Sequence, residues 1–323
     1  MSRLLDARDP GALAAAAELL RAGGIVAFPT ETVYGLGAIF DNQRAVARVF
    51  EVKGRPRFDP VIVHVSGPEW LERLVREVPG PARRLIERFW PGPLTLVLPR
   101  RPAVPDIVTA GLDTVAVRAP SHPVASRLIE LTGAPLAAPS ANRFGRLSPV
   151  DAGEVLRQLP EGPDAVLDGG RTPVGVESTV IGFAAGRPVL LRPGGLPVEE
   201  IERVAGKVGR EERAGRPRAP GQLPRHYAPE QPLLLVDRLE EVAPAERAGA
   251  AALAFRRRPL EGFLRVEALT EAGDLREAAC NLFAALSRLA RSGASRIYAE
   301  KVPEEGLGRA IMDRLRRAGQ DTG

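Results

Sequence analysis

The sequence of 323 residues predicts a mixed α/β fold divided between two domains. A chain of this length exceeds the size at which a single hydrophobic core ordinarily stops growing. Short apolar runs of strand length alternate with stretches of helical spacing, the order of elements found in sheets that are covered by helices. A segment rich in proline and charge then separates this pattern from a shorter α/β pattern near the C-terminus.

Residues 1–208 are expected to form the larger domain, a twisted mixed sheet flanked by helices. Short apolar runs between turn-forming residues predict strands at 25–28, 61–65, 94–98, 115–118, 135–139, 165–168, 178–183 and 188–192. Amphipathic spacing and terminating glycines predict helices at 11–24, 42–54, 68–78, 81–90, 122–133 and 148–159.

Residues 209–231 have the composition of an extended linker, with prolines, charges and almost no aliphatic side chains. Residues 232–323 are then expected to form a smaller C-terminal α/β domain. Strands are predicted at 233–236, 251–255 and 296–300, and helices at 274–293 and 307–318. The helix at 274–293 is the clearest of these because apolar residues recur along one face.

The composition narrows the classes of protein to which the chain can belong. No apolar run is long enough to cross a bilayer and no signal-peptide pattern is present, so a cytoplasmic protein without membrane contact is expected. The single cysteine, Cys280, cannot form an internal disulfide, in agreement with a reducing compartment. With 1 cysteine and 3 histidines, a structural zinc site is not expected. The Walker, HExxH and GxSxG motifs are absent.

The charge of the chain favours anionic ligands. The formal net charge is +5 and the isoelectric point is near 9.9. Only 3 of the 45 cationic residues are lysine, so a lysine at a motif position is not a generic charge. Because no dense basic tract is present, the composition predicts no more than weak RNA binding.

Lys53 is the most informative single residue of the first domain. It lies on the apolar face of the predicted helix 42–54, immediately before Gly54. A buried ammonium needs an anionic partner, whereas a lysine at a helix end can also extend to water. Arg55 favours the first interpretation, because a planar guanidinium and a compact ammonium together suit a polyphosphate.

Polar side chains also follow several predicted strands. They occur in PTETVYG (29–35), PSAN (139–142) and VEST (176–179), which can meet at one edge of the sheet. Turns stabilised by local serine and asparagine hydrogen bonds explain the second and third motifs at least as well. His64 lies inside a predicted strand, and this pattern alone favours a core residue over a catalytic one.

In their order along the chain, these motifs resemble those of the threonylcarbamoyl-AMP synthase family with its YrdC-like domain. The resemblance rests on PTETVYGLG, KGRP, DPVIVHV, WPGPLTLVL, AGLDTVAVRAP, APSAN, GVESTVI and LRPGG. The linker sequence APGQLPRHYAP, followed by a small α/β domain, is similar to the longer two-domain form, which implies a Rossmann-like C-terminal domain. The resemblance covers essentially the whole chain.

The resemblance implies an ATP-dependent nucleotidyltransferase. Members join L-threonine, bicarbonate and ATP into threonylcarbamoyl-adenylate and diphosphate, and downstream proteins use this product to modify adenosine beside the anticodon of tRNA. Such a displacement needs positioning and charge stabilisation but no covalent enzyme group. Mg²⁺ is expected to arrive with ATP and not through protein ligands. The linker is expected to close over the site as a lid that shields the adenylate from water.

The resemblance also implies roles for particular residues. Arg118 would bind the threonine carboxylate, and Gly35 and Gly37 would let the backbone approach the substrate. The threonine site would consist of Thr32, His64, Arg118, Ser140 and Ser178. The ATP site would consist of Arg55, Asp59, Thr114, Ala138, Ser148, Arg192 and Tyr227. The catalytic group around the reacting phosphate would consist of Lys53, Arg55, Ser140 and Asn142.

One position departs from the family, and two alternative functions are considered. Asp59 stands where the family usually has asparagine, which places a negative charge near the nucleotide unless a cation or a purine amino group meets it. A non-catalytic RNA-binding module would bind RNA in a salt-sensitive way and release no diphosphate in response to threonine. A carbamoyl-transfer enzyme with another acceptor would be expected to carry further flanking modules.

Overall fold

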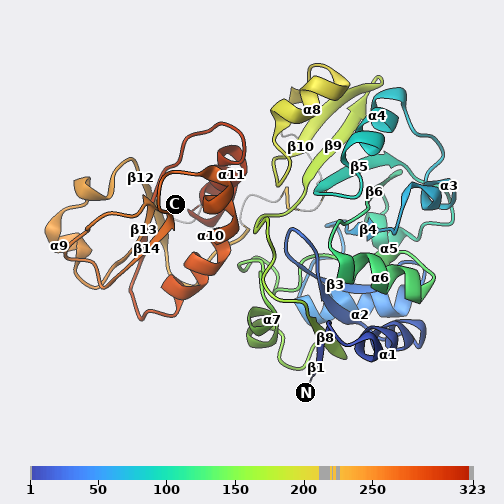
Figure 1. Ribbon diagram of the computed structural model, residues 1–323, viewed down its shortest axis with the longest axis horizontal. Coiled ribbons are helices and arrows are strands. Elements are labelled where there is room, and N and C mark those ends of the chain that lie inside the picture. Colours follow the sequence, from blue (N-terminus) through green and yellow to red (C-terminus); the bar gives the residue numbers. More distant parts are fainter. Residues whose placement is uncertain (1, 211–218, 220, 223–225, 320–323) are drawn as a thin grey trace.

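The computed structural model describes residues 2–210, 219, 221–222 and 226–319. Figure 1 shows a larger α/β body, coloured blue to yellow, beside a smaller one in orange and red. Each contains a sheet with helices packed against it, so the predicted mixed α/β class is confirmed. Much of the expected linker, namely residues 211–218, 220 and 223–225, lies outside the described residues.

The larger sheet has 11 strands in the part of the chain that the structure describes, and it mixes parallel with antiparallel pairs. In spatial order the strands are β1 (Arg3–Asp6), β8 (Ala165–Asp168), β2 (Val26–Pro29), β3 (Tyr34–Ile39), β7 (Leu136–Ala137), β4 (Ile62–His64), β6 (Thr114–Arg118), β5 (Leu94–Pro99), β9 (Thr179–Ala184), β10 (Arg187–Arg192) and β11 (Gly209–Arg210). β4 and β6 are parallel, and their register places His64 opposite Arg118. Two predicted site residues therefore end neighbouring strands.

Helices cover both faces of this sheet. They are α1 (Pro10–Arg21), α2 (Gln43–Lys53), α3 (Leu71–Leu74), α4 (Gly80–Phe89), α5 (Asp106–Thr109), α6 (Pro123–Thr132), α7 (Ala152–Gln158) and α8 (Val198–Ala205), with the 3-10 turn η1 (Pro68–Trp70). The single helix expected at 68–78 is therefore wrong, because the backbone becomes extended at Val75 and ends α3. Among the described residues, no helix is both long enough and apolar enough to cross a membrane.

Helix α2 ends so that Lys53 is directed into the protein. Its first turn is capped by Asn42, whose side chain accepts a hydrogen bond from the Ala45 amide at 3.1 Å. Its last turn is closed by Gly54 at φ 63°, a left-handed conformation that glycine adopts without steric cost. Val49 and Lys53 are both buried, as the apolar face of the predicted helix required.

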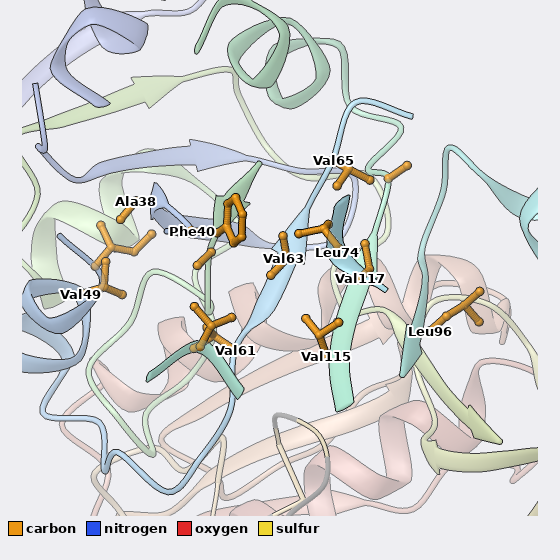
Figure 2. Packing of buried hydrophobic residues seen from close by; sticks show 14 of the residues in the cluster. Ala38, Phe40, Val49, Val61, Val63, Val65, Leu74, Leu96, Val115 and Val117 are labelled. Carbon is orange, nitrogen blue, oxygen red and sulfur yellow. The ribbon is translucent and has the colours of Figure 1, made fainter. Parts of the chain in front are cut away.

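The central strands are buried on both faces. Val63, Val115 and Val117 pack on one side in the main core (Figure 2). The alternate residues Ile62 and Ala116 belong to a second cluster on the other side. Burial on both faces explains why these strands are continuous apolar runs in the sequence and not alternating ones.

Strand β3 was not predicted, because its sequence YGLGAI contains two glycines. It pairs antiparallel with β2, with Phe28 opposite Gly35. A Cβ atom at Gly37 would lie 2.7 Å from the Phe28 ring, so Gly37 is needed for this packing. Gly35 borders the cavity described below, whereas Gly37 is not among its lining residues.

The C-terminal domain contains four parallel strands in its described residues. In spatial order they are β12 (Leu233–Val236), β15 (Ile297–Glu300), β13 (Ala251–Arg256) and β14 (Arg265–Thr270). The helical segments are η2 (Leu239–Glu241), α9 (Pro244–Arg247), α10 (Leu275–Ala290) and α11 (Gly308–Gly319). A parallel sheet with helices agrees with the Rossmann-like domain that the sequence predicted, although β14 was missed.

The two domains share a hydrophobic core. Val33, Val150 and Val176 of the larger domain belong to the same buried cluster as Leu282 and Phe283 of α10. Figure 1 shows α10 and α11 on the side of the small sheet that faces the larger domain. Burial of this kind binds the domains together through the hydrophobic effect as well as through polar contacts.

Candidate active site

A small cavity lies at the edge of the larger sheet where β4 and β6 end. Residues from each of the polar motifs singled out in the sequence contribute to its wall. The lining residues are Thr30, Thr32, Val33, Tyr34, Gly35, Arg55, Ile62, His64, Arg118, Ala138, Pro139, Ser140, Glu177, Ser178, Arg192, Gly221, His226 and Tyr227. The fold therefore brings together residues that are widely separated in the chain.

The cavity is too small for a nucleotide in this conformation. Its volume is about 50 Å³, whereas pockets for drug-sized ligands measure about 300–1,000 Å³. His226 and Tyr227 place two aromatic rings in the wall, with ring centres 4.1 Å apart. A space of this size holds a few water molecules, so a larger ligand requires part of the wall to move.

Arg118, at the end of β6, is held by contacts on all its nitrogen atoms. Its Nε donates to the Gly92 carbonyl at 3.2 Å, and its Nη1 donates to the Thr32 hydroxyl at 2.9 Å. Its Nη2 lies 2.6 Å from Glu31 Oε1, a distance typical of an ion pair, but makes no hydrogen bond to any described residue. An arginine has five N–H donors, so Arg118 retains donors for a further carboxylate.

His64 lies next to Arg118 and is only 4 % exposed. Burial and the charge of Arg118 lower the pKa of His64 to about 3. The imidazole is therefore neutral near pH 7, and its Nδ1 has no hydrogen-bond partner in the described chain. A neutral ring can contact hydroxyl or methyl groups but does not neutralise a carboxylate.

Ser178 and Arg192 form a second polar part of the wall. The Ser178 hydroxyl lies 2.7 Å from Thr95 Oγ1, and it accepts a hydrogen bond from Arg192 Nη2 at 3.2 Å. Arg192 Nη2 also donates to the Ser178 carbonyl at 2.9 Å. Burial is the main cause that lowers the pKa of Arg192, although a guanidinium remains protonated near neutrality.

Lys53 lies behind the wall and not in its lining. It is 2 % exposed, so the alternative of a lysine extended to water is wrong. Its Nζ donates to the carbonyl oxygens of Ser140 and Asn142 at 2.6 and 2.5 Å. Burial, followed by the charge of Arg55, holds the pKa of Lys53 well below its usual range. An approaching phosphate would favour the charged form again.

Arg55 and Asp59 form a buried ion pair, with Arg55 Nη2 2.9 Å from Asp59 Oδ2. Arg55 also donates to the backbone carbonyls of Asp59 at 3.1 Å and Pro60 at 2.7 Å. Burial raises the pKa of Asp59, while the charges of Arg55 and Lys53 oppose that rise. The guanidinium of Arg55 therefore neutralises the negative charge that Asp59 places at this position.

Other predicted site residues lie outside the lining. Asn142 donates from Nδ2 to the carbonyls of Arg143 and Arg146 at 2.7 and 2.9 Å, and it holds the loop after β7. Ser148 donates to the Glu177 carboxylate. Thr114 begins β6, whereas Arg118 ends it.

Glu177, Gly221 and His226 line the cavity although the sequence did not single them out as site residues. Gly221 has φ 76°, and a Cβ atom there would lie 2.5 Å from Tyr227 Oη, so only glycine fits. His226 is buried, which lowers its pKa, and Arg55 lowers it further. The available signals were an acidic residue inside VEST and the glycine and histidine of the linker motif.

The described residues do not supply a metal site. They contain no group of three or more His, Cys, Asp or Glu residues that could hold a metal ion. The carboxylates of Glu31, Asp59 and Glu177 are each paired with an arginine, namely Arg118, Arg55 and Arg314. The residues present therefore do not fit Mg²⁺ held by protein ligands alone.

Comparison with known proteins identifies the family. Residues 18–194 match the family described as Telomere recombination, and residues 196–319 match the family described as Threonylcarbamoyl-AMP synthase, C-terminal domain. The threonylcarbamoyl-AMP synthase of Pyrococcus abyssi is 46 % identical over 320 residues, which cover 94 % of this chain and 92 % of that protein. The chain belongs to the threonylcarbamoyl-AMP synthase family.

Two further comparisons agree with membership of the threonylcarbamoyl-AMP synthase family. The Bacillus subtilis threonylcarbamoyl-AMP synthase is 42 % identical over 327 residues, covering 97 % of this chain and 94 % of that protein. The crystal structure of P. abyssi Sua5 complexed with L-threonine matches with a TM-score of 0.92 at 43 % identity, covering 99 % of this chain and 97 % of that chain. The resemblance noted in the sequence is therefore confirmed.

Proposed function

We propose that the protein is a nucleotidyltransferase that joins L-threonine, bicarbonate and ATP into threonylcarbamoyl-adenylate and diphosphate. The observation that carries this proposal is a single cavity whose wall contains Arg118 with Thr32 and also Arg55 with Arg192. A guanidinium beside hydroxyl groups suits an amino acid, and several buried cations suit a polyphosphate. Membership of the threonylcarbamoyl-AMP synthase family supports both assignments.

Threonine would bind at the end of β6. Its carboxylate would accept hydrogen bonds from Arg118, whose Nη2 is buried without a hydrogen-bond partner among the described residues. Thr32, Ser140 and Ser178 would provide hydroxyl contacts, and the neutral ring of His64 would contact the side chain. Glu31 Oε1 lies 2.6 Å from the same Nη2, so the threonine carboxylate would share Arg118 with the Glu31 carboxylate.

In the proposed reaction the threonine nitrogen attacks the carbon of bicarbonate, and water leaves to give a carbamate. A carbamate oxygen then attacks the α-phosphorus of ATP. The bond from that phosphorus to the bridging oxygen breaks, and diphosphate leaves with the electron pair. Lys53 and Arg55 would stabilise the charge on the phosphoryl oxygens, with Ser140 and Asn142 positioned beside them.

The remaining residues of the ATP site would hold the nucleotide. These residues are Asp59, Thr114, Ala138, Ser148, Arg192 and Tyr227. Because the cavity measures about 50 Å³, Gly221 and His226 in its wall would have to move outward when ATP enters, while the Tyr227 ring stays against α10 and α11. This part of residues 209–231 would then act as the lid expected from the sequence.

The proposed reaction also involves Mg²⁺, downstream proteins and tRNA. Mg²⁺ would enter bound to the phosphates of ATP, because the described carboxylates at the site are paired with arginines. The adenylate would pass to downstream proteins that modify adenosine beside the anticodon of tRNA. Any contact with RNA would be weak and sensitive to salt.

The test follows diphosphate release by the purified protein with ATP, Mg²⁺, bicarbonate and one amino acid at a time. Threonine is expected to stimulate release, whereas serine, valine and alanine are not. Omission of bicarbonate is the matched control, and mass spectrometry identifies the adenylate. Diphosphate release at the same rate with and without threonine would contradict the proposal. Salt-sensitive RNA binding without any release would favour the RNA-binding alternative.

A further inference from the structure

Arg314 connects the C-terminal domain to the wall of the cavity. It lies on α11, and its side chain is fully buried at 0 % exposure. A guanidinium is buried at high cost unless hydrogen bonds and opposite charges replace its water. Glu177 and Pro193 of the larger domain accept hydrogen bonds from it, so Arg314 joins the two domains through buried polar contacts.

The partners of Arg314 lie at the cavity. Its Nε donates to Glu177 Oε2 at 2.9 Å, and its Nη1 donates to the Pro193 carbonyl at 2.8 Å. Its guanidinium carbon lies 5.0 Å from the centre of the Tyr227 ring, within the range of a cation–π contact. Glu177 and Tyr227 line the cavity, and Pro193 follows the lining residue Arg192.

The charge of Arg314 compensates the charge of the Glu177 carboxylate. Glu177 is 7 % exposed, and its carboxylate accepts hydrogen bonds from Ser148 and Arg314. A carboxylate in the wall of a triphosphate site would repel the phosphates, and low local polarity would strengthen that repulsion. Arg314 neutralises this charge, while Asp313 at 2.8 Å adds a second anion that favours the protonated guanidinium.

Tyr227 also depends on the C-terminal domain. It has φ 63°, a left-handed conformation that costs a non-glycine residue about 1–3 kcal/mol. Such a conformation persists only where the surroundings impose it. The Tyr227 ring lies against Arg314 on α11 and against Phe283 on α10, whose ring centre is 5.7 Å away.

We propose that Arg314 is a positioning residue through which the C-terminal domain shapes the nucleotide side of the cavity. It neutralises Glu177 and fixes the Tyr227 ring without itself touching substrate. This inference rests on the proposed function, because it assigns ATP to that side. No described contact joins Arg314 to Arg118 or Thr32, so its loss should weaken ATP binding more than threonine binding.

The test compares Arg314→Ala, Arg314→Lys, Glu177→Gln and the double variant Arg314→Ala with Glu177→Gln. The matched control is Arg309→Ala. Arg309 is also on α11 and also pairs with the larger domain, through Glu199 on α8 at 3.1 Å, but this pair is partly exposed and outside the cavity lining. KM for ATP, KM for threonine, kcat and the melting temperature are measured for each full-length protein.

Arg314→Ala is expected to raise the KM for ATP at least about tenfold, the equivalent of about 1.4 kcal/mol, with little change in the KM for threonine. Arg314→Lys keeps the positive charge but not the planar guanidinium, so its KM for ATP should lie between those of the unmodified protein and Arg314→Ala. The double variant should recover part of the loss, because it removes the unpaired carboxylate. Arg309→Ala should keep the kinetic constants of the unmodified protein.

Three outcomes would overturn the inference. The KM values for ATP and threonine could rise together in proportion to a lower melting temperature, which is the behaviour of a purely structural residue. The double variant could lose as much as the two single variants combined. If Arg314→Ala does not fold, an unchanged KM for ATP in Arg314→Lys decides against the inference. A failure of the proposed function is distinguished from these because the unmodified protein would itself release no threonine-dependent diphosphate.

Discussion

Replacement of Lys53 by methionine tests the proposed chemistry most directly. Methionine has nearly the same length but neither charge nor N–H donors. In the free protein the change removes three hydrogen bonds, to the carbonyls of Ser140 and Asn142 and, at 3.5 Å, to Asn142 Oδ1. Each buried carbonyl left without a donor costs about 1–3 kcal/mol. Removal of a buried amine, whose pKa burial already lowers, offsets part of this cost, so the melting temperature should fall by less than these costs added together imply.

The effect on the reaction should be much larger. A preorganised group that stabilises charge in the transition state contributes about 3–4 kcal/mol, so kcat/KM for adenylate formation should fall by about two to three powers of ten. The assay is threonine-dependent diphosphate release, with the folded fraction measured in parallel. Lys301→Met is the matched control, because Lys301 is 46 % exposed and pairs with Asp237 at the surface. A folded Lys53→Met protein with the activity of the control would refute the reasoning.

Two further predictions concern Arg118 and His64. Arg118→Lys replaces the planar guanidinium by an ammonium group. The KM for threonine should therefore rise about tenfold to a hundredfold, while the KM for ATP stays nearly constant. Arg127→Lys, at an exposed position on α6, is the control. His64 has a pKa of about 3 in the folded protein and an ordinary value of 6.5. Between about pH 3 and pH 6.5 the unfolded chain therefore binds more protons than the folded protein. In this window the free energy of unfolding should fall as the pH falls, by up to about 1.4 kcal/mol per pH unit from this residue. Urea titrations at several pH values should show a smaller slope for His64→Gln.

Either prediction can fail in a recognisable way. Equal increases in both KM values for Arg118→Lys would mean that Arg118 supports the whole cavity and not the amino-acid site. An unchanged pH slope in His64→Gln would mean that His64 is not held neutral by the fold. A remaining slope is still expected, because the pKa of buried His226 is lowered as well.

Elements with strong local patterns were predicted from the sequence. The strand at 165–168 has the bounds of β8, and the helix at 274–293 contains α10. β3 was missed because glycine is rare in strands, yet Gly37 is required there by the Phe28 ring. β14 was missed because RVEALT lies at the edge of its sheet, where arginine and glutamate are tolerated.

The site was predictable to the extent that its residues lie in local motifs. The place of Lys53 on the apolar face follows from helical spacing. The grouping of His64 with Arg118 was implied only by the family resemblance, because the pairing of β4 with β6 that joins them is not defined by spacing along the chain. The Arg55–Asp59 pair requires a loop conformation that spacing alone does not define. Arg314 could not be found in this way, because 137 residues separate it from Glu177 and only the packing of two domains brings them together.

The hydrophobic core common to both domains limits how the protein can be recombined with its relatives. Val33 adjoins the proposed threonine contact Thr32, yet it packs in one cluster with Leu282 and Phe283 of α10. A chimera that exchanges only the C-terminal domain would set foreign side chains against Val33, Val150 and Val176. Voids or clashes at that seam would reach the substrate loop directly. The two domains must therefore be inherited, or engineered, as a matched pair.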